Sequence, residues 1–400
     1  MRIVSIATHM PYVGIPHAGG QYYLRHAEIL SETHDLTVIC PWTPANAQAM
    51  DEPVHGSYRR FLVVPQNRRG ALRRGARRSL WSRALTFVTM GSFLRAVLAD
   101  ERATELLRTA DRIELQWFDA IALAPRLRRL VPGTPLTGVF HDVASQGYRR
   151  RARARDVPPV HRLLSVVRWW LSAPLERRVT PALDTAVVFS DKDAALLARR
   201  RAGDRIRVVL PPLDDEEMPL APREQQPTAP DVLFVGALWR PENEDAALWL
   251  LRDVWPTVRQ AVPHASLTVA GHGPTARLQV EVGRIDGVEL TGSVPTLAPF
   301  YRRAAVVVVP MRQGAGVKFK TVVALLWGVP VVTTAVGAEG IGERNLFVAV
   351  EDEPAAFAHA VVGALQDPVR ALQVAAAAQA WASARYSTAT FRRALAELYR

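Results

Sequence analysis

The sequence has 400 residues, enough for two domains that each bury a core of their own. Its hydrophobic share of 49% is ordinary for a soluble protein, and no apolar run reaches the roughly 20 residues that span a bilayer, which argues against an integral membrane protein. The single cysteine, Cys40, excludes an intrachain disulfide, and the first residues lack the pattern of a signal peptide, so we expect a cytoplasmic protein.

The net charge of +12 is concentrated in the first half of the chain. Residues 1–210 carry 33 Lys and Arg against 18 Asp and Glu, whereas residues 211–400 carry 17 against 20. Two clusters stand out, at 68–83 and 149–155. Either a GC-rich genome or a basic patch facing an anionic membrane surface or an acidic acceptor explains them. We do not expect a nucleic-acid partner, because no helix-turn-helix, zinc or aromatic single-strand motif is present.

Strand-like and helix-like segments alternate along the chain, which predicts an α/β fold with parallel sheets. In the first half we expect strands at 3–7, 36–40, 61–64, 112–116, 136–140, 185–189 and 206–210. In the second half we expect strands at 232–235, 266–270, 288–291, 306–309 and from 330 onward.

Two features of the first half suit a ligand at the carboxyl edge of its sheet. Gly19 and Gly20 lie between the first strand and its helix, where a diglycine allows close backbone approach, although such a turn also serves packing. His141 and Asp142 follow the strand at 136–140, and the open alternative is a structural turn in which Asp142 caps the next helix.

Two further segments of the first half carry large apolar side chains. A helix is expected at 159–179, and its Trp169, Trp170 and Leu171 are more typical of a core than of a ligand platform. The basic segment 66–83 is either a loop or a short cationic helix, and the aromatic residues around and after it either form an apolar surface or enter the core.

The proline- and acid-rich stretch at 211–230 predicts a linker, since the charge balance changes sign across it. We therefore predict a first domain at 1–210, a second domain at 231–385, and a C-terminal helix at 386–400 that packs back on the first domain. Two open parallel sheets joined in this way are expected to face each other across a cleft that holds a ligand.

The stretch 306–342 (VVVVPMRQGAGVKFKTVVALLWGVPVVTTAVGAEGIG) carries the sharpest chemical signal. A buried strand leads into the small-residue turn Gly314–Ala315–Gly316, and a helix is expected from Val317, with Lys318 and Lys320 in its first turn. Lysines there oppose the helix dipole unless an anion is bound, so the pattern predicts a phosphate site.

The second half resembles the retaining group 1 glycosyltransferases of the GT-B fold. The resemblance rests on LFVGALWRPENEDAA from Leu233, LTVAGHGP from Leu267, GVELTGS from Gly287 and the stretch from Val306 described above. It is strong over about 110 residues and weaker in the first half. It implies two Rossmann-like domains facing across a cleft, a nucleotide-sugar donor held mainly by the second domain, an acceptor held mainly by the first (the acceptor-side domain, 1–210), and no need for a metal or other cofactor.

The resemblance also implies roles for individual residues. Lys318 and His141 are the catalytic candidates, the former facing the diphosphate and the latter the donor sugar. The donor-binding candidates are Gly19, Gly20, Asp142, Gly236, Arg240, Gly314, Ala315, Gly316, Val317, Lys320 and Val323.

The sequence departs from the family pattern where the family has two glutamates and two basic residues. Ala315 and Val323 stand where the glutamates are usual, and Ala237 and Asn243 stand near the basic positions, for which Arg240 is a possible substitute. Valine cannot bind a ribose diol, which makes a deoxythymidine-diphosphate sugar a candidate donor.

Two other functions stay open from the sequence. The missing glutamates favour a non-catalytic binding or partner protein, and the architecture is shared by non-hydrolysing nucleotide-sugar epimerases. The acceptor (lipid-linked, polysaccharide or small molecule) is not specified by any motif.

Overall fold

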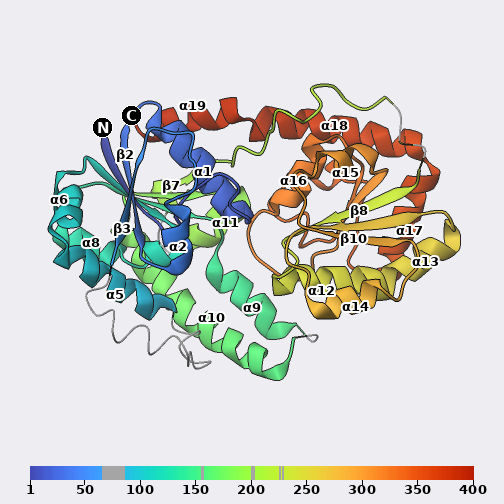
Figure 1. Ribbon diagram of the computed structural model, residues 1–400, viewed down its shortest axis with the longest axis horizontal. Helices are drawn as coiled ribbons and strands as arrows, with labels where there is room; N and C mark the ends of the chain where they lie inside the picture. The colour runs from blue at the N-terminus through green and yellow to red at the C-terminus, as the bar shows by residue number, and fades with distance from the viewer. Residues whose placement is uncertain (65–85, 155–156, 200–202, 225–226, 228) are drawn as a thin grey trace. The chain divides into compact units, whose positions relative to one another are not determined.

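The computed structural model describes residues 1–64, 86–154, 157–199, 203–224, 227 and 229–400 (Figure 1). The chain divides into two compact units, Met1–Val209 with Leu398–Arg400, and Leu210–Glu397. Each unit is built on one parallel sheet with helices on both faces, so the predicted α/β class with two parallel sheets is confirmed.

The first domain has a seven-stranded parallel sheet in the order β3-β2-β1-β4-β5-β6-β7. Its central strands are mostly buried and rich in apolar residues because helices cover both faces of the sheet. Their bounds are β1 Arg2–Ile6, β2 Asp35–Pro41, β3 Arg59–Val63, β4 Arg112–Gln116, β5 Leu136–Phe140, β6 Thr185–Val188 and β7 Ile206–Val208.

The helices of the first domain lie on both faces of this sheet (Figure 1). They are α1 Ala18–Ser31, α2 Pro44–Ala49, α5 Thr86–Ala99, α6 Glu101–Thr109, α7 Trp117–Ile121, α8 Ala124–Leu130, α9 Ala144–Arg153, α10 Pro159–Val179 and α11 Asp191–Leu197. Short 3-10 turns occur at Thr180–Ala182 and Gly203–Arg205. Cys40 is fully buried in β2, as expected of a core residue.

The second domain has a six-stranded parallel sheet in the order β10-β9-β8-β11-β12-β13. The bounds are β8 Asp231–Val235, β9 Ser266–Ala270, β10 Val288–Gly292, β11 Val306–Val309, β12 Val331–Thr333 and β13 Ala349–Val350. Its helices are α12 Pro241–Trp249, α13 Trp255–Ala261, α14 Ala276–Val282, α15 Ala298–Arg303, α16 Phe319–Leu326, α17 Pro354–Gln366, α18 Pro368–Tyr386 and α19 Thr388–Leu398, with a 3-10 turn at Arg344–Leu346.

The helix predicted at 243–261 is interrupted. The segment Leu250–Val254 between α12 and α13 is a π-helix. Pro256 has no N–H to donate to the preceding turn, and the widened turn accommodates this loss. Trp249 and Trp255 are still buried, as predicted.

Two further expectations about helices were wrong. α16 begins at Phe319 and not at Val317, because the positive φ of Gly316 keeps the turn open, so Lys318 is the N-cap residue. In α10, Trp170 is 71% exposed and Leu171 is 41% exposed, whereas we expected both in the core. The residues that α10 buries are instead mostly polar: Glu176 bonds Ser145 of α9, and the hydroxyls of Ser165 and Ser172 bond carbonyl oxygens of α10 itself.

The basic cluster at 68–83 lies outside the described residues, whereas Phe93 in α5 is buried in the core. In the part of the chain that the structure describes, none of the helices combines the length and the apolar character that a membrane span requires.

Candidate functional site

Each sheet has a switch point, where the connections leaving two neighbouring strands run to opposite faces. It lies between β1 and β4 in the first sheet and between β8 and β11 in the second. In open α/β sheets, ligands bind beyond the carboxyl ends of the strands at such a point. The loops after these four strands contain most of the predicted site residues.

The turn after β11 in the second domain contains the predicted anion site. Gly314 and Gly316 have φ values of 110° and 68°, which glycine adopts without strain. Lys318, the N-cap residue of α16, donates from Nζ to the carbonyl oxygen of Ala315 at 3.2 Å and to that of Gly316 at 2.7 Å. This lysine therefore braces the turn that it was predicted to complete.

Lys320, in the first turn of α16, brings a second ammonium to the switch point. Its Nζ donates to Oδ1 of Asn243 at 2.6 Å and lies 4.8 Å from the ring centroid of Phe234. A Cβ on Gly236 would lie 2.9 Å from this nitrogen, so the glycine leaves room for the ammonium. The segments that follow β8 and β11 thus meet at Lys320.

The surroundings of Lys320 disfavour its charge. Loss of hydration lowers the pKa of Lys320 to about 7; the charges of Arg240 and Lys318 add to this effect and that of Glu242 opposes it. A bound anion would restore the charged form. The group is therefore suited to respond to an anionic ligand near neutral pH.

The distribution of lysine supports a specific role for these two residues. The whole sequence contains three lysines, Lys192, Lys318 and Lys320, among 50 basic residues. In a chain that otherwise uses arginine, two of the three stand at the start of one helix. Lysine differs from arginine in having a compact ammonium whose pKa shifts readily on burial.

The other predicted residues of the second domain are placed as follows. Val323 is the one residue between Thr321 and Leu326 that is not buried, and it follows Lys320 by one helical turn on the same face of α16. Arg240, the N-cap residue of α12, forms an ion pair with Glu242 at 2.7 Å. Arg240 is thus engaged within its own loop.

His141 in the first domain sits in an aromatic cluster at the end of β5. Its ring stacks on Trp117 at 4.4 Å between centroids, and Tyr22 and Phe189 approach it edge-on at 5.1 and 5.2 Å. Trp117 has a φ of 65°, the one positive value among the described non-glycine residues. Backbone strain of this kind is often found at functional sites.

A buried hydrogen-bond chain fixes the protonation of His141. Burial alone would raise the pKa of Glu114, but the charge of His26 and hydrogen bonds from His26, Tyr399 and Gln116 outweigh it and lower this pKa to about 2. The ionised Glu114 accepts a hydrogen bond from Gln116 Nε2 at 2.8 Å, which fixes the orientation of the Gln116 amide. The oxygen Oε1 of Gln116 therefore faces His141, and it accepts a hydrogen bond from His141 Nε2–H at 3.0 Å.

The imidazole of His141 is therefore neutral, and its Nδ1 is unprotonated. Burial and the charges of His26 and His17 hold the pKa of His141 well below its usual range. A Cβ on Gly19 would lie 3.2 Å from Nδ1, which places this acceptor against the start of α1. Such a histidine can accept a hydrogen bond from a ligand hydroxyl but carries no charge to offer.

Packing accounts for the two glycines. A Cβ on Gly20 would lie 2.3 Å from Cδ1 of Ile15, so a larger residue there would require the side chain of Ile15 to move. The structural alternative for Asp142, that it caps the next helix, is not observed. The N-cap residue of α9 is Val143, which makes no side-chain cap bond. Burial raises the pKa of Asp119, and the nearby charge of Asp142 raises it further.

The sequence reasoning missed the partners of His141. Glu114 and Gln116 alternate with apolar residues in a strand that is buried on both faces, and such buried polar residues need partners. Polar residues in such a strand could therefore have been predicted to form a buried hydrogen-bond network. The strained Trp117 and the position of Lys320 against Asn243 depend on tertiary contacts, which no local pattern shows.

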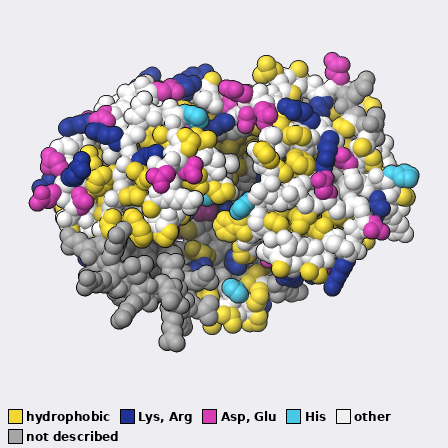
Figure 2. Space-filling model, in the orientation of Figure 1, with side chains coloured by type: hydrophobic (Ala, Val, Ile, Leu, Met, Phe, Trp, Pro, Cys, Tyr) yellow, Lys and Arg dark blue, Asp and Glu magenta, His cyan; other side chains and the backbone are white. Residues whose placement is uncertain are grey.

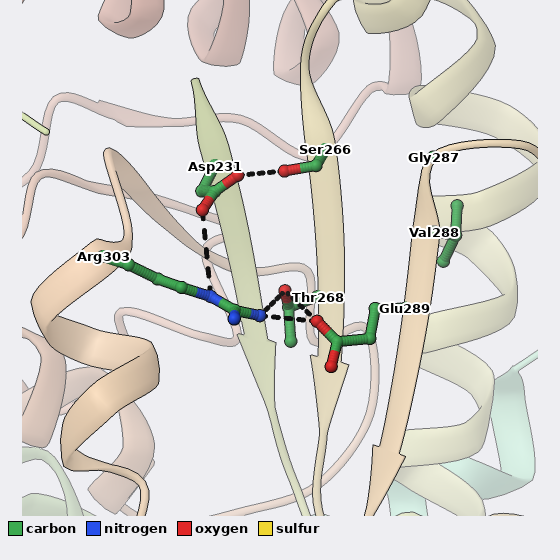
Figure 3. A pocket seen from close by; sticks show the side chains of 7 residues that line it. All are labelled: Asp231, Ser266, Thr268, Gly287, Val288, Glu289 and Arg303. Carbon is green, nitrogen blue, oxygen red and sulfur yellow. Dashed lines mark hydrogen bonds and ion pairs between the residues drawn. The ribbon is translucent and has the colours of Figure 1, made fainter. Parts of the chain in front are cut away.

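A shallow pocket of about 380 Å³ lies at the opposite, amino-terminal edge of the second sheet (Figure 3). Its polar groups satisfy one another, since Arg303 bonds Glu289 at 2.5 Å and Thr268 at 2.9 Å, and Ser266 donates to Asp231. This edge lies away from the switch point, and we assign it no ligand.

Comparison with known proteins agrees with this geometry. Residues 229–367 match the family model of glycosyl transferases group 1. Among solved structures, sucrose-phosphate synthase from Thermosynechococcus elongatus is similar with a TM-score of 0.74 and 17% identity, over 100% of this chain and 98% of that chain. HepE of Anabaena in complex with UDP and glucose is similar with a TM-score of 0.68 and 14% identity, over 100% and 99%.

A third match is an uncharacterised protein in the cps region of Klebsiella pneumoniae, 34% identical over 122 residues. This match covers 29% of the present chain and 31% of that relative, about a third of its length. The chain has the GT-B fold, with two Rossmann-like domains. Its second domain is of the glycosyltransferase group 1 type.

Proposed function

We propose that this protein is a retaining glycosyltransferase that moves a sugar from a nucleotide-diphosphate donor to an acceptor hydroxyl without a metal. The observation that carries the proposal is the partly neutralised ammonium of Lys320 beside the glycine-rich turn at the switch point of the second sheet. The bond from the anomeric carbon of the sugar to the diphosphate breaks. The acceptor oxygen forms a new bond to that carbon on the face from which the diphosphate left. The acceptor proton leaves with the nucleoside diphosphate.

The second domain holds the donor in this proposal. Lys320 and the amides of Gly314–Val317 bind the diphosphate and stabilise the charge that develops as it leaves. Lys318 holds the turn in shape through the carbonyl groups of Ala315 and Gly316. Lys320 also supplies a positive charge next to Asn243, where the family pattern has a basic residue.

The first domain contributes hydrogen bonds and shape. The bare Nδ1 of His141 accepts from a hydroxyl of the donor sugar, and Trp117 holds the imidazole in place. Asp142, Gly19 and Gly20 line the same strand ends, and the acceptor binds on this domain. The UDP and glucose bound to HepE, and the cps region that encodes the Klebsiella protein, support a nucleotide-sugar donor and a role in glycan synthesis.

The second candidate function, binding without catalysis, is favoured by Val323, which offers no carboxylate on the open face of α16. Thermal shift of the full chain with UDP, dTDP, GDP and ADP, followed by incubation with the matching sugar donors, separates the two functions. We expect one diphosphate to raise the melting temperature and its sugar donor to be consumed with release of that diphosphate.

Other outcomes contradict the proposal. Stabilisation without consumption of any donor indicates a binding protein. Conversion of the donor into an isomer without release of diphosphate indicates an epimerase. Absence of any shift at millimolar concentration removes the donor site itself.

Val323 provides a prediction about the nucleotide. A glutamate at this position would reach a ribose diol, so the Val323→Glu variant should shift donor use from thymidine towards uridine sugars by roughly tenfold, the scale of one hydrogen bond to a charged group. The control is Val369→Glu, at an exposed position in α18 of the same domain. Equal use of both donors, unchanged in Val323→Glu, would remove the deoxyribose hypothesis.

A further inference from the structure

Helix α10 of the first domain buries polar side chains and exposes apolar ones, the reverse of an ordinary amphipathic helix. Its inward side carries Ser165, Ser172 and Glu176, all at most 2% exposed. Glu176 accepts from the backbone N and the hydroxyl of Ser145 in α9, at 2.9 and 2.7 Å. α9 and α10 thus form a helical hairpin that is joined by buried polar contacts.

The outward side of α10 is apolar. Val160, Leu163, Trp170 and Leu171 are 54%, 64%, 71% and 41% exposed, and they recur at the three- and four-residue spacing of one helix face. Some of this surface is visible as the hydrophobic atoms at the lower edge of Figure 2, where α10 lies in Figure 1. An exposed apolar stripe of this length marks an interaction surface.

Positive charge surrounds the stripe. Arg149 and Arg153 in α9 and Arg177 and Arg178 at the end of α10 are all exposed. Among the described residues of the hairpin, the one acidic residue is Glu176, which is buried against Ser145. The outer surface of the hairpin therefore combines tryptophan and leucine with arginine and lacks any exposed carboxylate among these residues.

We propose that the α9–α10 hairpin docks the protein on an anionic lipid surface. Tryptophan and leucine enter the interface between headgroups and acyl chains, and the arginines bind the headgroups. A second copy of the chain is disfavoured as the occupant, because a symmetric contact would bring the arginines of both copies together. The helix lies on the membrane and does not cross it.

The test is co-sedimentation of the full chain with vesicles made of equal parts phosphatidylcholine and phosphatidylglycerol, at low and high salt. The variant is Leu163→Ser with Trp170→Ser. Its matched control is Leu220→Ser with Trp239→Ser, an exposed leucine and an exposed tryptophan of the second domain. We expect the variant to lose at least roughly tenfold in partition coefficient, and the control to bind like the wild type.

Charge is tested with Arg177→Gln and Arg178→Gln, which should weaken binding and reduce its dependence on salt. Equal binding to pure phosphatidylcholine would contradict the role of the arginines. Equal losses in variant and control, or no binding of the wild type at low salt, would overturn the proposal. The proposal would also be overturned if the wild type formed a dimer that does not bind vesicles and if the Leu163→Ser, Trp170→Ser variant were monomeric.

Discussion

Replacing Lys320 by methionine is expected to slow sugar transfer by roughly two to three orders of magnitude, the cost of one preorganised donor to a developing negative charge. Methionine keeps most of the length of the side chain and removes the ammonium that bonds Asn243 Oδ1 at 2.6 Å. The measurement is kcat/KM with the donor identified by thermal shift.

Two companion variants sharpen this prediction. Lys320→Arg keeps the charge but replaces the compact ammonium, which lies 2.9 Å from where a Cβ on Gly236 would be, by a larger planar guanidinium, so we expect it to remain impaired by at least about tenfold. Lys192→Met is the control, because Lys192 pairs with Asp193 at 2.7 Å in α11. Transfer by Lys320→Met within about threefold of the wild type would contradict the role of Lys320 in stabilising the leaving group.

Replacing His26 by leucine is expected to reduce the free energy of unfolding of the first domain by about 3–5 kcal/mol. His26 Nε2 bonds Glu114 Oε2 at 2.8 Å, and both side chains are buried. Removing the histidine leaves the carboxylate of Glu114 without its charged partner in the core. Denaturant unfolding, followed by circular dichroism, measures the loss.

His34→Leu is the matched control, since both ring nitrogens of His34 are buried without a hydrogen-bond partner. The same substitution there removes no hydrogen bond, so we expect little change or a gain in stability. A loss in His34→Leu as large as in His26→Leu would show that leucine fits poorly at either position, and the ion pair would then not be the cause.

The His26–Glu114 pair also predicts how the stability of the first domain depends on pH. The pKa of Glu114 is about 2 in the folded protein, below its value of about 4.3 in an unfolded chain. The ionised group therefore adds stability above about pH 4.3, and this contribution is lost as the pH falls towards 2. The difference in stability between wild type and His26→Leu should shrink over that range.

Except for the two-residue strand β13 (Ala349–Val350), which was not predicted, the strands and their order in the chain were predictable because a strand buried on both faces reads as a short apolar run. Val306–Val309 and Leu136–Phe140 were predicted with their observed bounds for this reason. The carboxyl-edge location of Gly19, His141 and Lys318 followed from the same pattern. Local sequence was sufficient wherever periodicity alone decides the structure.

Predictions failed where a distant contact decides the structure. Trp170 reads as a core residue because it is large and apolar, whereas in the fold α10 buries Glu176 against Ser145 on its other side and leaves Trp170 exposed. Likewise, Lys318 and Lys320 look equivalent in the sequence. Their side chains differ in the fold because one folds back on the turn and the other reaches Asn243 on another helix.

The most direct test of the central claim is calorimetric titration of the wild type and of Lys320→Met with the nucleotide sugar that binds, in buffers of different ionisation enthalpy. Such a ligand has no group that titrates near neutral pH. Because the pKa of Lys320 in the free protein is lowered to about 7, binding at pH 7 should take up a fraction of a proton in the wild type and none in the variant. Binding without proton uptake, or equal uptake by both proteins, would contradict the account.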